Sequence, residues 1–133
     1  MRSDHVREIK FRAWNKREKK MVDVHTIDFC NGNINANDSD NYDDIVLGFD
    51  SILMQYTGIK DKNKTEIYEG DIVEAWSEGV KGVGYIKKRN DGLWFIYPSY
   101  QKKLMWYLKP DENDYDNVTV LGNIYENPEL LKE

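Results

Sequence analysis

Short apolar runs separated by turn residues fill the second half of the chain, and this pattern constrains the fold more than any other feature. Alternating apolar residues occupy positions 71–76, 93–97 and 118–121, and a further run covers 83–86. Asn90-Asp91-Gly92 has the composition of a hairpin turn between two of these runs. Many short strands at about ten-residue spacing are typical of small β-barrels. The sequence therefore predicts a small closed barrel in this half of the chain.

The first half of the chain predicts a β-hairpin. Ile9, Phe11 and Ala13 alternate with charged or aromatic neighbours, which is the period of a half-buried strand. The polar stretch 15–20 interrupts this alternation, and residues 21–29 continue as a second extended run. A helix in the polar stretch is the competing interpretation, but so short a helix is not stable alone.

The residues that follow this hairpin are more ambiguous. Asn31-Gly32 predicts a type I′ turn, because both central positions of that turn need positive φ angles. An acidic stretch at 35–44 predicts an exposed loop. The apolar run 45–49 suits a strand or a short helix, and residues 51–56 predict a strand. Near the end of the chain, Asn127-Pro128-Glu129 has the order of a helix N-terminus and predicts one short helical turn.

The composition places limits on the environment of the protein. A lone cysteine, Cys30, cannot form an internal disulfide, and we expect it to be a small buried hydrophobe beside Phe29. No apolar run approaches the roughly 20 residues that cross a bilayer, and the N-terminus lacks the apolar region of a signal peptide. These features predict a cytoplasmic protein that does not contact membranes.

Three segments carry a resemblance to a known family. They are KFRAWNKREKKMV at 10–22, LMQYTGIKDKNKTEIYEGDIVE at 53–74 and VLGNIYENPELL at 120–131. Together they resemble the YopX family of phage and prophage proteins. The resemblance implies an all-β fold with an SH3-type barrel and an origin in a phage infecting bacteria. It implies no enzymatic activity and supplies no catalytic residues.

With this resemblance, we expect a mostly β fold with an N-terminal β-hairpin layer, an SH3-like small β-barrel and a short C-terminal helix. The N-terminal β region is 1–56 and the barrel region is 57–133, and we expect them to form one compact unit. Within the middle motif, Asp61 and Asp71 are expected to bond to turn backbone, as short acidic side chains commonly do. Ile72 and Trp76 are expected in the core.

The basic and aromatic segment 81–109 is the one candidate binding site. It carries seven bases and one acid, interleaved with aromatic residues. Bases of a nucleic acid can stack on aromatic rings while lysine and arginine contact phosphates. The candidate nucleic-acid-binding residues are Lys87, Lys88, Arg89, Trp94, Lys102 and Lys103. The competing interpretation, which we favour, is that the aromatic residues form the core.

Catalytic patterns are missing from the sequence. The glycines of 79–84 lack the lysine and helix of a phosphate-binding loop, and there is no paired-cysteine zinc pattern. The aspartates between 35 and 50 lack the spacing of a calcium-binding loop. We therefore predict no enzyme, no metal and no cofactor.

The preferred function is a non-enzymatic, protein-binding or homo-oligomeric assembly module of a phage. The chain has a net charge of -5, which disfavours general nucleic-acid binding, and 17 aromatic residues (9 Tyr, 4 Phe, 4 Trp), which suggest an apolar interface. The expected partners are a second copy of the chain or a phage or host protein. A nucleic-acid-binding barrel is the alternative.

Overall fold

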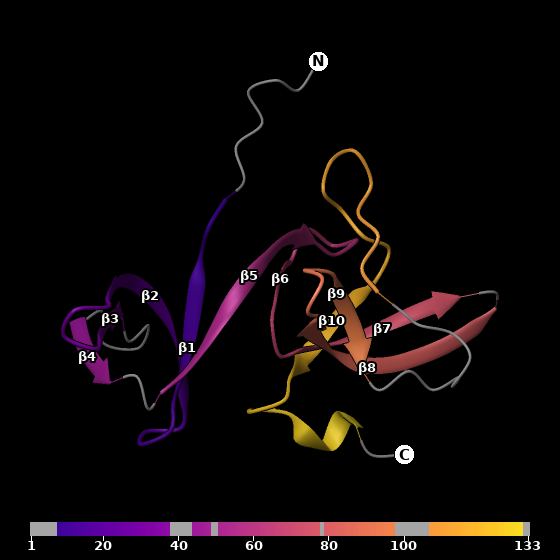
Figure 1. The fold of residues 1–133 in the computed structure, drawn as a ribbon. Coiled ribbons are helices and arrows are strands. Elements are labelled where there is room, and N and C mark those ends of the chain that lie inside the picture. The colour runs from indigo at the N-terminus through magenta and orange to yellow at the C-terminus, as the bar shows by residue number, and fades with distance from the viewer. Residues whose placement is uncertain (1–7, 38–43, 49–50, 78, 98–106, 132–133) are drawn as a thin grey trace. The chain divides into compact units, whose positions relative to one another are not determined.

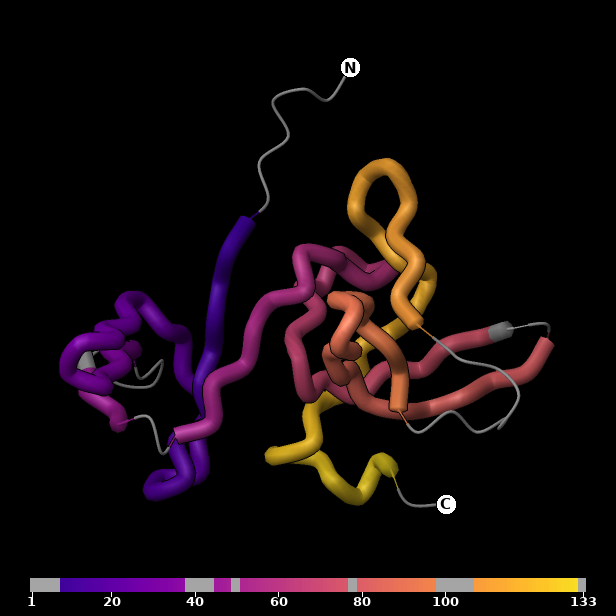
Figure 2. The backbone as a smooth tube through the Cα atoms, in the orientation of Figure 1, coloured from indigo at the N-terminus to yellow at the C-terminus, as the bar shows by residue number. Residues whose placement is uncertain are grey.

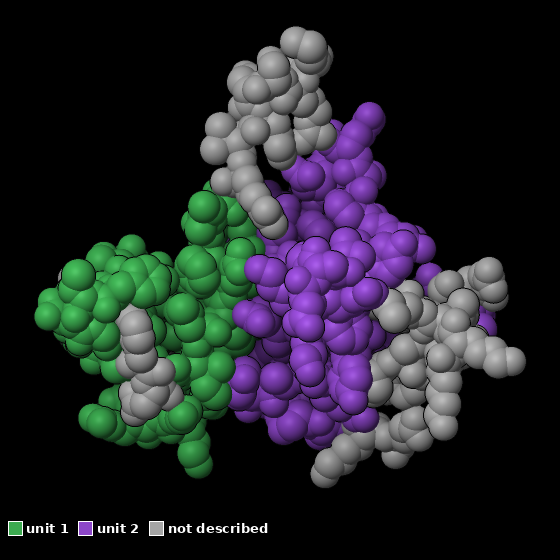
Figure 3. Space-filling model, in the orientation of Figure 1, with its two compact units in different colours: residues 1–56 green, residues 57–133 purple. Residues whose placement is uncertain are grey.

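The computed structural model describes residues 8–37, 44–48, 51–77, 79–97 and 107–131, and strands account for most of them (Figure 1). All sheet pairings given below are antiparallel, and the one helix among these residues is a single 3-10 turn. The predicted mostly β fold is thereby confirmed. The chain divides into two compact units, residues 1–56 and 57–133 (Figure 3).

Unit 1 is built from a meander of strands. Along the chain these are β1 (Phe11–Asn15), β2 (Lys20–Asp28), β3 (Asn33–Asn37), β4 (Asp44–Gly48) and the first half of β5 (Ile52–Lys60). The strand order is β4-β3-β2-β1-β5, followed by the short β6 (Glu66–Tyr68) beside β5. Residues 45–48 of the run 45–49 are therefore a strand and not a helix, and residue 49 lies outside the described residues.

The predicted N-terminal hairpin is confirmed by the pairing of β1 with β2. Asn15 lies opposite Lys20, so the polar stretch between them is a turn and not a helix. The side chain of Asn15 holds this turn, because its Oδ1 accepts the backbone N–H of Arg17 at 3.1 Å. Lys19 completes the reversal with a φ of 55°.

The turn between β2 and β3 differs from the predicted type I′ turn. Gly32 has a φ of 71°, but Asn31 is not among the described residues with positive φ, and the N–H of Gly32 bonds to the carbonyl of Asp28. The loop is thus two residues longer than predicted. Asp28 caps it with its carboxylate, and the hydrogen bonds from Asn31 lower the pKa of that carboxyl.

This longer loop corrects the prediction for Cys30. The cysteine is exposed, and the neighbouring Phe29 is 80% exposed. Both lie between strands, at the position where the chain reverses, so neither faces the core. The core cluster of unit 1 consists instead of Ala13, Val22 and Ala36, with four partly buried residues packed against it: Val24, Ile45, Leu47 and Leu53.

Unit 2 contains a four-stranded sheet in the order β10-β7-β8-β9. Its strands are β7 (Asp71–Ser77), β8 (Val80–Lys88), β9 (Trp94–Tyr97) and β10 (Thr119–Asn123). A 3-10 helix, η1 (Pro128–Leu131), follows and begins at the predicted proline. The described strands form an open order, and closure into an SH3-like barrel stays a prediction.

The core of unit 2 lies on one face of this sheet. Its buried residues are Ile59, Ile67, Val73, Ala75, Ile86, Trp94, Ile96, Leu108 and Val118. Glycine at position 84 permits this packing, because a Cβ there would lie 2.8 Å from Cγ2 of Ile96. The face of β7, β8 and β9 that points away from this cluster is the candidate binding surface.

A buried carboxylate joins the middle motif to the last strand. Asp61 is 1% exposed, and its Oδ1 accepts the backbone N–H groups of Asn63 at 2.8 Å and Thr65 at 2.9 Å. Its Oδ2 accepts the N–H of Val120 at 2.9 Å. Asp71 likewise accepts the N–H of Tyr68 at 2.8 Å. Both aspartates bond to turn backbone, as predicted.

Residues 107–118 form a long loop before β10 (Figure 2). Its returning part runs beside the end of β5, where the N–H of Lys60 bonds to the carbonyl of Asp114. Lys62 then bonds to the carbonyl of Val118. These contacts, together with the Asp61 carboxylate, cover the outer edge of β10.

Candidate binding face

Strand alternation divides the basic and aromatic segment into two sets. On β8 and β9, Ile86, Trp94 and Ile96 face the core cluster. Their neighbours in sequence face the other way, because successive side chains of a strand point to opposite sides of the sheet. The sequence predicted either a core or a binding surface for the aromatic residues, and the structure buries Trp94 while it leaves Tyr97 exposed.

The outward set forms one continuous surface across the sheet, called here the outer face. Cross-strand pairs define it: Trp76 lies opposite Lys81, Tyr85 opposite Tyr97, and Lys87 opposite Phe95. An isolated bridge places Tyr107 opposite Phe95 on the other side of β9. Ile72 shares this side of the sheet with Trp76 but is fully buried, so that end of the face is covered. The remaining residues of the outer face are Glu74, Trp76, Lys81, Val83, Tyr85, Lys87, Phe95, Tyr97, Tyr107 and Lys109.

The aromatic rings of the outer face pack edge to face. The ring centroids of Tyr85 and Tyr97 are 5.6 Å apart with an interplanar angle of 70°. Phe95 and Tyr97 are 6.0 Å apart at 89°. Such T-shaped pairs are favourable arrangements of the ring quadrupoles. The cluster is therefore ordered by its own contacts before any partner binds.

Lysine ammonium groups border these rings. The Nζ of Lys87 lies 5.3 Å from the ring centroid of Tyr97, and the Nζ of Lys109 lies 4.9 Å from that of Tyr107. Both distances are within the range of cation–π attraction. Tyr97 and Tyr107 remain 45% and 37% exposed. The face thus offers aromatic surface and positive charge together.

Trp76 is the functional candidate that sequence reasoning missed. It was predicted in the core, but it is 59% exposed. Residues 75–77 and 80–82 pair only with each other among the described strands, so this end of the β7–β8 hairpin extends beyond β9 and β10 (Figure 1). Trp76 lies on that extension, where nothing described covers its outer side. Alternation along β7 did not reveal this exposure, because Trp76 shares its side of the strand with the fully buried Ile72.

The predicted nucleic-acid-binding residues do not form one group. Trp94 is 5% exposed and belongs to the core, so it cannot serve as a platform on which bases stack. Lys88 lies over its ring, with Nζ 5.6 Å from the centroid. Lys87 is on the outer face, and Arg89 is in the β8–β9 turn. Lys102 and Lys103 lie outside the described residues.

The indole N–H of Trp94 has no hydrogen-bond acceptor among the described residues, although the atom is buried. An unsatisfied buried donor costs about 1–3 kcal/mol of stability. The ring therefore stabilises the core through its size and its contacts, and part of that gain is offset at this nitrogen.

Carboxylates are interspersed with the bases of unit 2. Glu74 lies 3.9 Å from the Nζ of Lys81, and Asp91 lies 3.0 Å from a guanidinium nitrogen of Arg89. The turn also holds an open depression of ≈ 410 Å³, lined by Lys88, Arg89, Asn90, Asp91 and Phe95. The surface is therefore mixed in charge, which suits a protein surface better than a row of phosphates.

No group of three or more His, Cys, Asp or Glu side chains among the described residues could hold a metal ion. Asp116 is the notable carboxyl: burial raises its pKa, and the hydrogen bond from the backbone N–H of Lys109 partly opposes this.

Among the described residues, no helix has the length and apolar character needed to span a bilayer.

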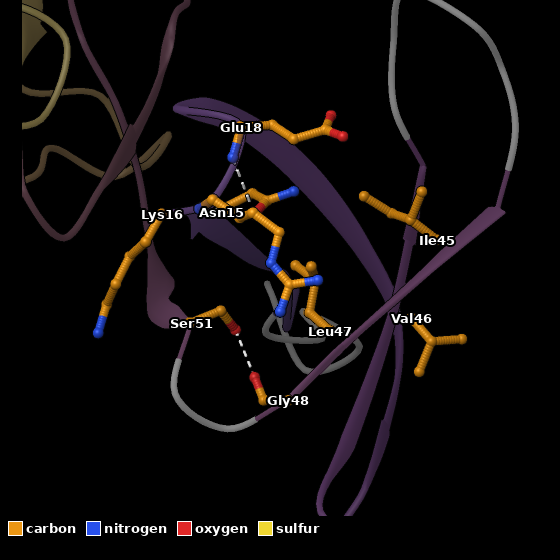
Figure 4. A pocket seen from close by; sticks show the side chains of 9 residues that line it. Asn15, Lys16, Glu18, Ile45, Val46, Leu47, Gly48 and Ser51 are labelled. Carbon is orange, nitrogen blue, oxygen red and sulfur yellow. Dashed lines mark hydrogen bonds between the residues drawn. The ribbon is translucent and has the colours of Figure 1, made fainter.

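A second hollow lies in unit 1, between β4 and the turn that joins β1 to β2 (Figure 4). Its volume is ≈ 210 Å³. Ile45 and Leu47 give it apolar walls, and the side chains of Arg17 and Ser51 contribute polar ones. Ser51 is held there by a 2.7 Å hydrogen bond from its hydroxyl to the carbonyl of Gly48. Sequence reasoning did not identify this groove.

Comparison with known proteins identifies relatives of the whole chain. A family model described as YopX protein matches residues 10–132. Among solved structures, protein EF1440 from Enterococcus faecalis is similar: it is 27% identical with a TM-score of 0.59, and the alignment covers 96% of this chain and 100% of that chain. No curated protein matches the sequence. The resemblance predicted from the three motifs is thereby confirmed.

Proposed function

Because the chain belongs to the YopX family, we propose that it is a non-enzymatic module of a phage or prophage that binds proteins, including copies of itself, in the bacterial cytoplasm. The observation that carries this proposal is the outer face of unit 2. It presents Trp76, Tyr97 and Tyr107 to solvent on a single sheet surface. Contiguous exposed aromatic surface is typical of protein interfaces.

The aromatic side chains of the outer face are held in place before a partner binds, which favours binding. Tyr85, Phe95 and Tyr97 hold one another by edge-to-face contacts, so little side-chain entropy remains to be lost when a partner covers them. Tyrosine and tryptophan side chains supply large contact areas and also polar atoms, and they are common among the residues that dominate binding energies. A partner would therefore gain most of its affinity from this small set.

The charges on the face indicate the chemistry of the partner. Lys87 and Lys109 lie at its margin with their ammonium groups over aromatic rings. An acidic protein segment with apolar side chains would meet the rings at the centre and the lysines at the rim. Glu74 in the same surface disfavours a continuous polyanion, because it brings a negative charge beside Lys81.

The test is affinity capture from lysate of the host bacterium after nuclease treatment, followed by calorimetric titration of each purified partner. Trp76→Ala and Tyr97→Ala should each weaken binding about tenfold or more, which is the loss expected for a central interface residue. Phe29→Ala is the matched control, because it removes an exposed aromatic ring of unit 1. Equal binding by wild type and both outer-face variants would refute the proposal.

Nucleic-acid binding is the second candidate, favoured by the depression around Lys88 and Arg89 and by Lys87 beside it. If it is correct, a fluorescent single strand should bind with nanomolar affinity in an anisotropy titration. Replacing Lys87 and Lys88 by Ala should then flatten the salt dependence by about one unit per lost phosphate contact. We expect instead only non-specific binding, at about 10⁻⁴ to 10⁻⁶ M in physiological salt.

A further inference from the structure

We propose that β4 pairs with β4 of a second copy of the chain, antiparallel about a two-fold axis at Val46. The inference names a surface for the self-association included in the proposed function and rests on that part of it. The outer face belongs to unit 2, whereas β4 belongs to unit 1, so the two surfaces can be tested separately.

The first observation is that β4 is an edge strand at the end of its sheet. Among the described residues it pairs with β3 alone, and only the carbonyl of Gly48 has a further backbone partner, the N–H of Ser51. The other sheet is better covered. Leu108 bonds to the carbonyl of Trp94 on β9, and Asp61 accepts the N–H of Val120 on β10.

The second observation is that the described residues of β4 include no lysine, proline or bulge, which are common devices that prevent edge pairing. Proteins protect edge strands with lysine, proline, bulges or covering segments. The interior of β4 is Ile45-Val46-Leu47, without charge or proline, and its register with β3 is regular. By contrast, the pairings of β2 with β3 and of β10 with β7 both contain a shift in register.

The third observation selects a second copy as the occupant. In the proposed register Val46 lies opposite Val46 of the second copy, and Ile45 lies opposite its Leu47. Asp44 lies opposite Gly48 of the second copy, so the register does not align position 44 with itself. Cross-strand pairs of β-branched and aliphatic residues stabilise sheets, whereas like charges in opposition destabilise them. The sequence of β4 is thus complementary to itself.

Burial in the single chain agrees with this register. Val46 is 66% exposed, and it lies on the opposite side of the β4 ribbon from Leu47 (Figure 4). Ile45 and Leu47 pack on the core of unit 1 and line the groove beside the strand. Pairing would cover the two Val46 side chains with each other and would continue the half-buried row of Ile45 and Leu47 into the second sheet.

The pairing is short, and this sets its strength. Five residues per copy bury less surface than the roughly 1,200 Å² that marks the low end of stable interfaces. The dimer should therefore form in the micromolar range and depend on concentration.

The experiment measures molar mass by light scattering and sedimentation equilibrium of the full chain over a series of micromolar concentrations. Wild type should approach twice the chain mass of 15.7 kDa. Val46→Lys places two ammonium groups opposite each other and should raise the dissociation constant at least about tenfold. Phe29→Lys, at another exposed apolar position of unit 1, is the matched control and should leave it unchanged.

A charge exchange distinguishes pairing at Val46 from a general effect on folding. Val46→Lys and Val46→Glu should each be monomeric alone, and an equimolar mixture should restore the dimer. In a Cys30→Ser background, Val46→Cys should form an intermolecular disulfide under mild oxidation, because opposed residues of antiparallel strands lie within disulfide range. Circular dichroism verifies that each variant is folded.

The outcomes separate the two proposals. A monomeric wild type, or a dimer unaffected by Val46→Lys, overturns the pairing of β4. Loss of the dimer in Trp76→Ala but not in Val46→Lys overturns it as well and assigns self-association to the outer face. If Trp76→Ala does not weaken the binding of any partner, the proposal that the outer face binds proteins is refuted, and the proposed pairing of β4 is unaffected.

Discussion

The two units of the chain bury their strands to different extents. Among the described residues, unit 2 has a core cluster of nine buried residues that includes Trp94 and four isoleucines, whereas the cluster of unit 1 has three, Ala13, Val22 and Ala36. Both edges of the unit 2 sheet also have hydrogen-bond partners, while β4 of unit 1 pairs with β3 alone among the described residues. A unit with a small core and an open edge gains proportionally more from association.

The buried polar groups follow the same division. In unit 2, Asp61 and Asp71 are almost fully buried and bond to backbone N–H groups. In unit 1, the polar side chain that organises a turn is Asn15, which is uncharged. Buried, fully bonded carboxylates fix a unique arrangement of the chain around them. The longest of the three recognisable motifs, 53–74, contains both of these aspartates.

The largest expected effect tests the core of unit 2. Trp94→Ala should lower the free energy of unfolding by about 3–5 kcal/mol, the range for truncating a buried aromatic residue. Trp76→Ala is the control on the same sheet and should change it by less than about 0.5 kcal/mol, because the ring is exposed. Urea melts measure both. Similar losses at the two sites would mean that the assignment of inner and outer faces is wrong.

The next effect tests the buried carboxylate. Asp61→Ala leaves three backbone N–H groups without their acceptor and should cost about 3 kcal/mol or more, since each unsatisfied buried donor costs about 1–3 kcal/mol. Asp28→Ala removes a carboxylate with a similar turn-capping pattern in unit 1, but at an exposed loop. It should have a clearly smaller effect in the same urea melts. Equal losses of stability in Asp61→Ala and Asp28→Ala would refute the proposed difference in carboxylate burial between the units.

A smaller effect compares the two units within one sample. In the monomeric Val46→Lys variant, the backbone amides of β4 should exchange with deuterium at least about tenfold faster than those of β7, because local opening is easiest where few buried contacts hold a strand. Exchange is followed by mass spectrometry of peptic fragments. Uniform protection across both units would show that they open together.

The smallest effect concerns pH. Because burial raises the pKa of Asp116, the folded chain binds this proton more tightly than the unfolded chain does. Its contribution to stability is therefore most favourable below the unfolded pKa and declines as pH rises through the raised folded value. Asp116→Asn should abolish this decline and raise stability at pH 7 by less than about 1 kcal/mol. Urea melts of wild type and Asp116→Asn at several pH values measure this difference. A loss of stability in the variant at pH 7 would contradict the expectation.

Local patterns in the sequence predicted much of the fold. Alternation at β1 and β2 gave the hairpin, Pro128 gave the start of η1, and the short acids Asp61 and Asp71 were expected to bond to turn backbone, which they do. These features depend on residues close in sequence, so a single chain is enough to infer them.

Features that depend on distant parts of the chain could not be inferred in the same way. Alternation shows that Trp76 and Ile72 share a face, but only the lengths of the neighbouring strands decide that Ile72 is fully buried and Trp76 is exposed. The exposure of the candidate site residues was likewise decided by strand pairing that the sequence did not reveal. The sequence identified a basic and aromatic segment, and the pairing of β8 with β9 assigned Trp94 to the core and Tyr97 to the surface.

The hydrogen bond from Val120 to Asp61 has a consequence for synthesis on the ribosome. The two residues are 59 positions apart, and the acceptor is made first. Until the last strand leaves the exit tunnel, the carboxylate lacks the partner that its burial requires, so the loop around it must remain hydrated. Unit 1 is complete in sequence long before this point, because N-terminal segments emerge first. A nascent chain would therefore present β4 to its neighbours on the same message while the second unit is still unfinished.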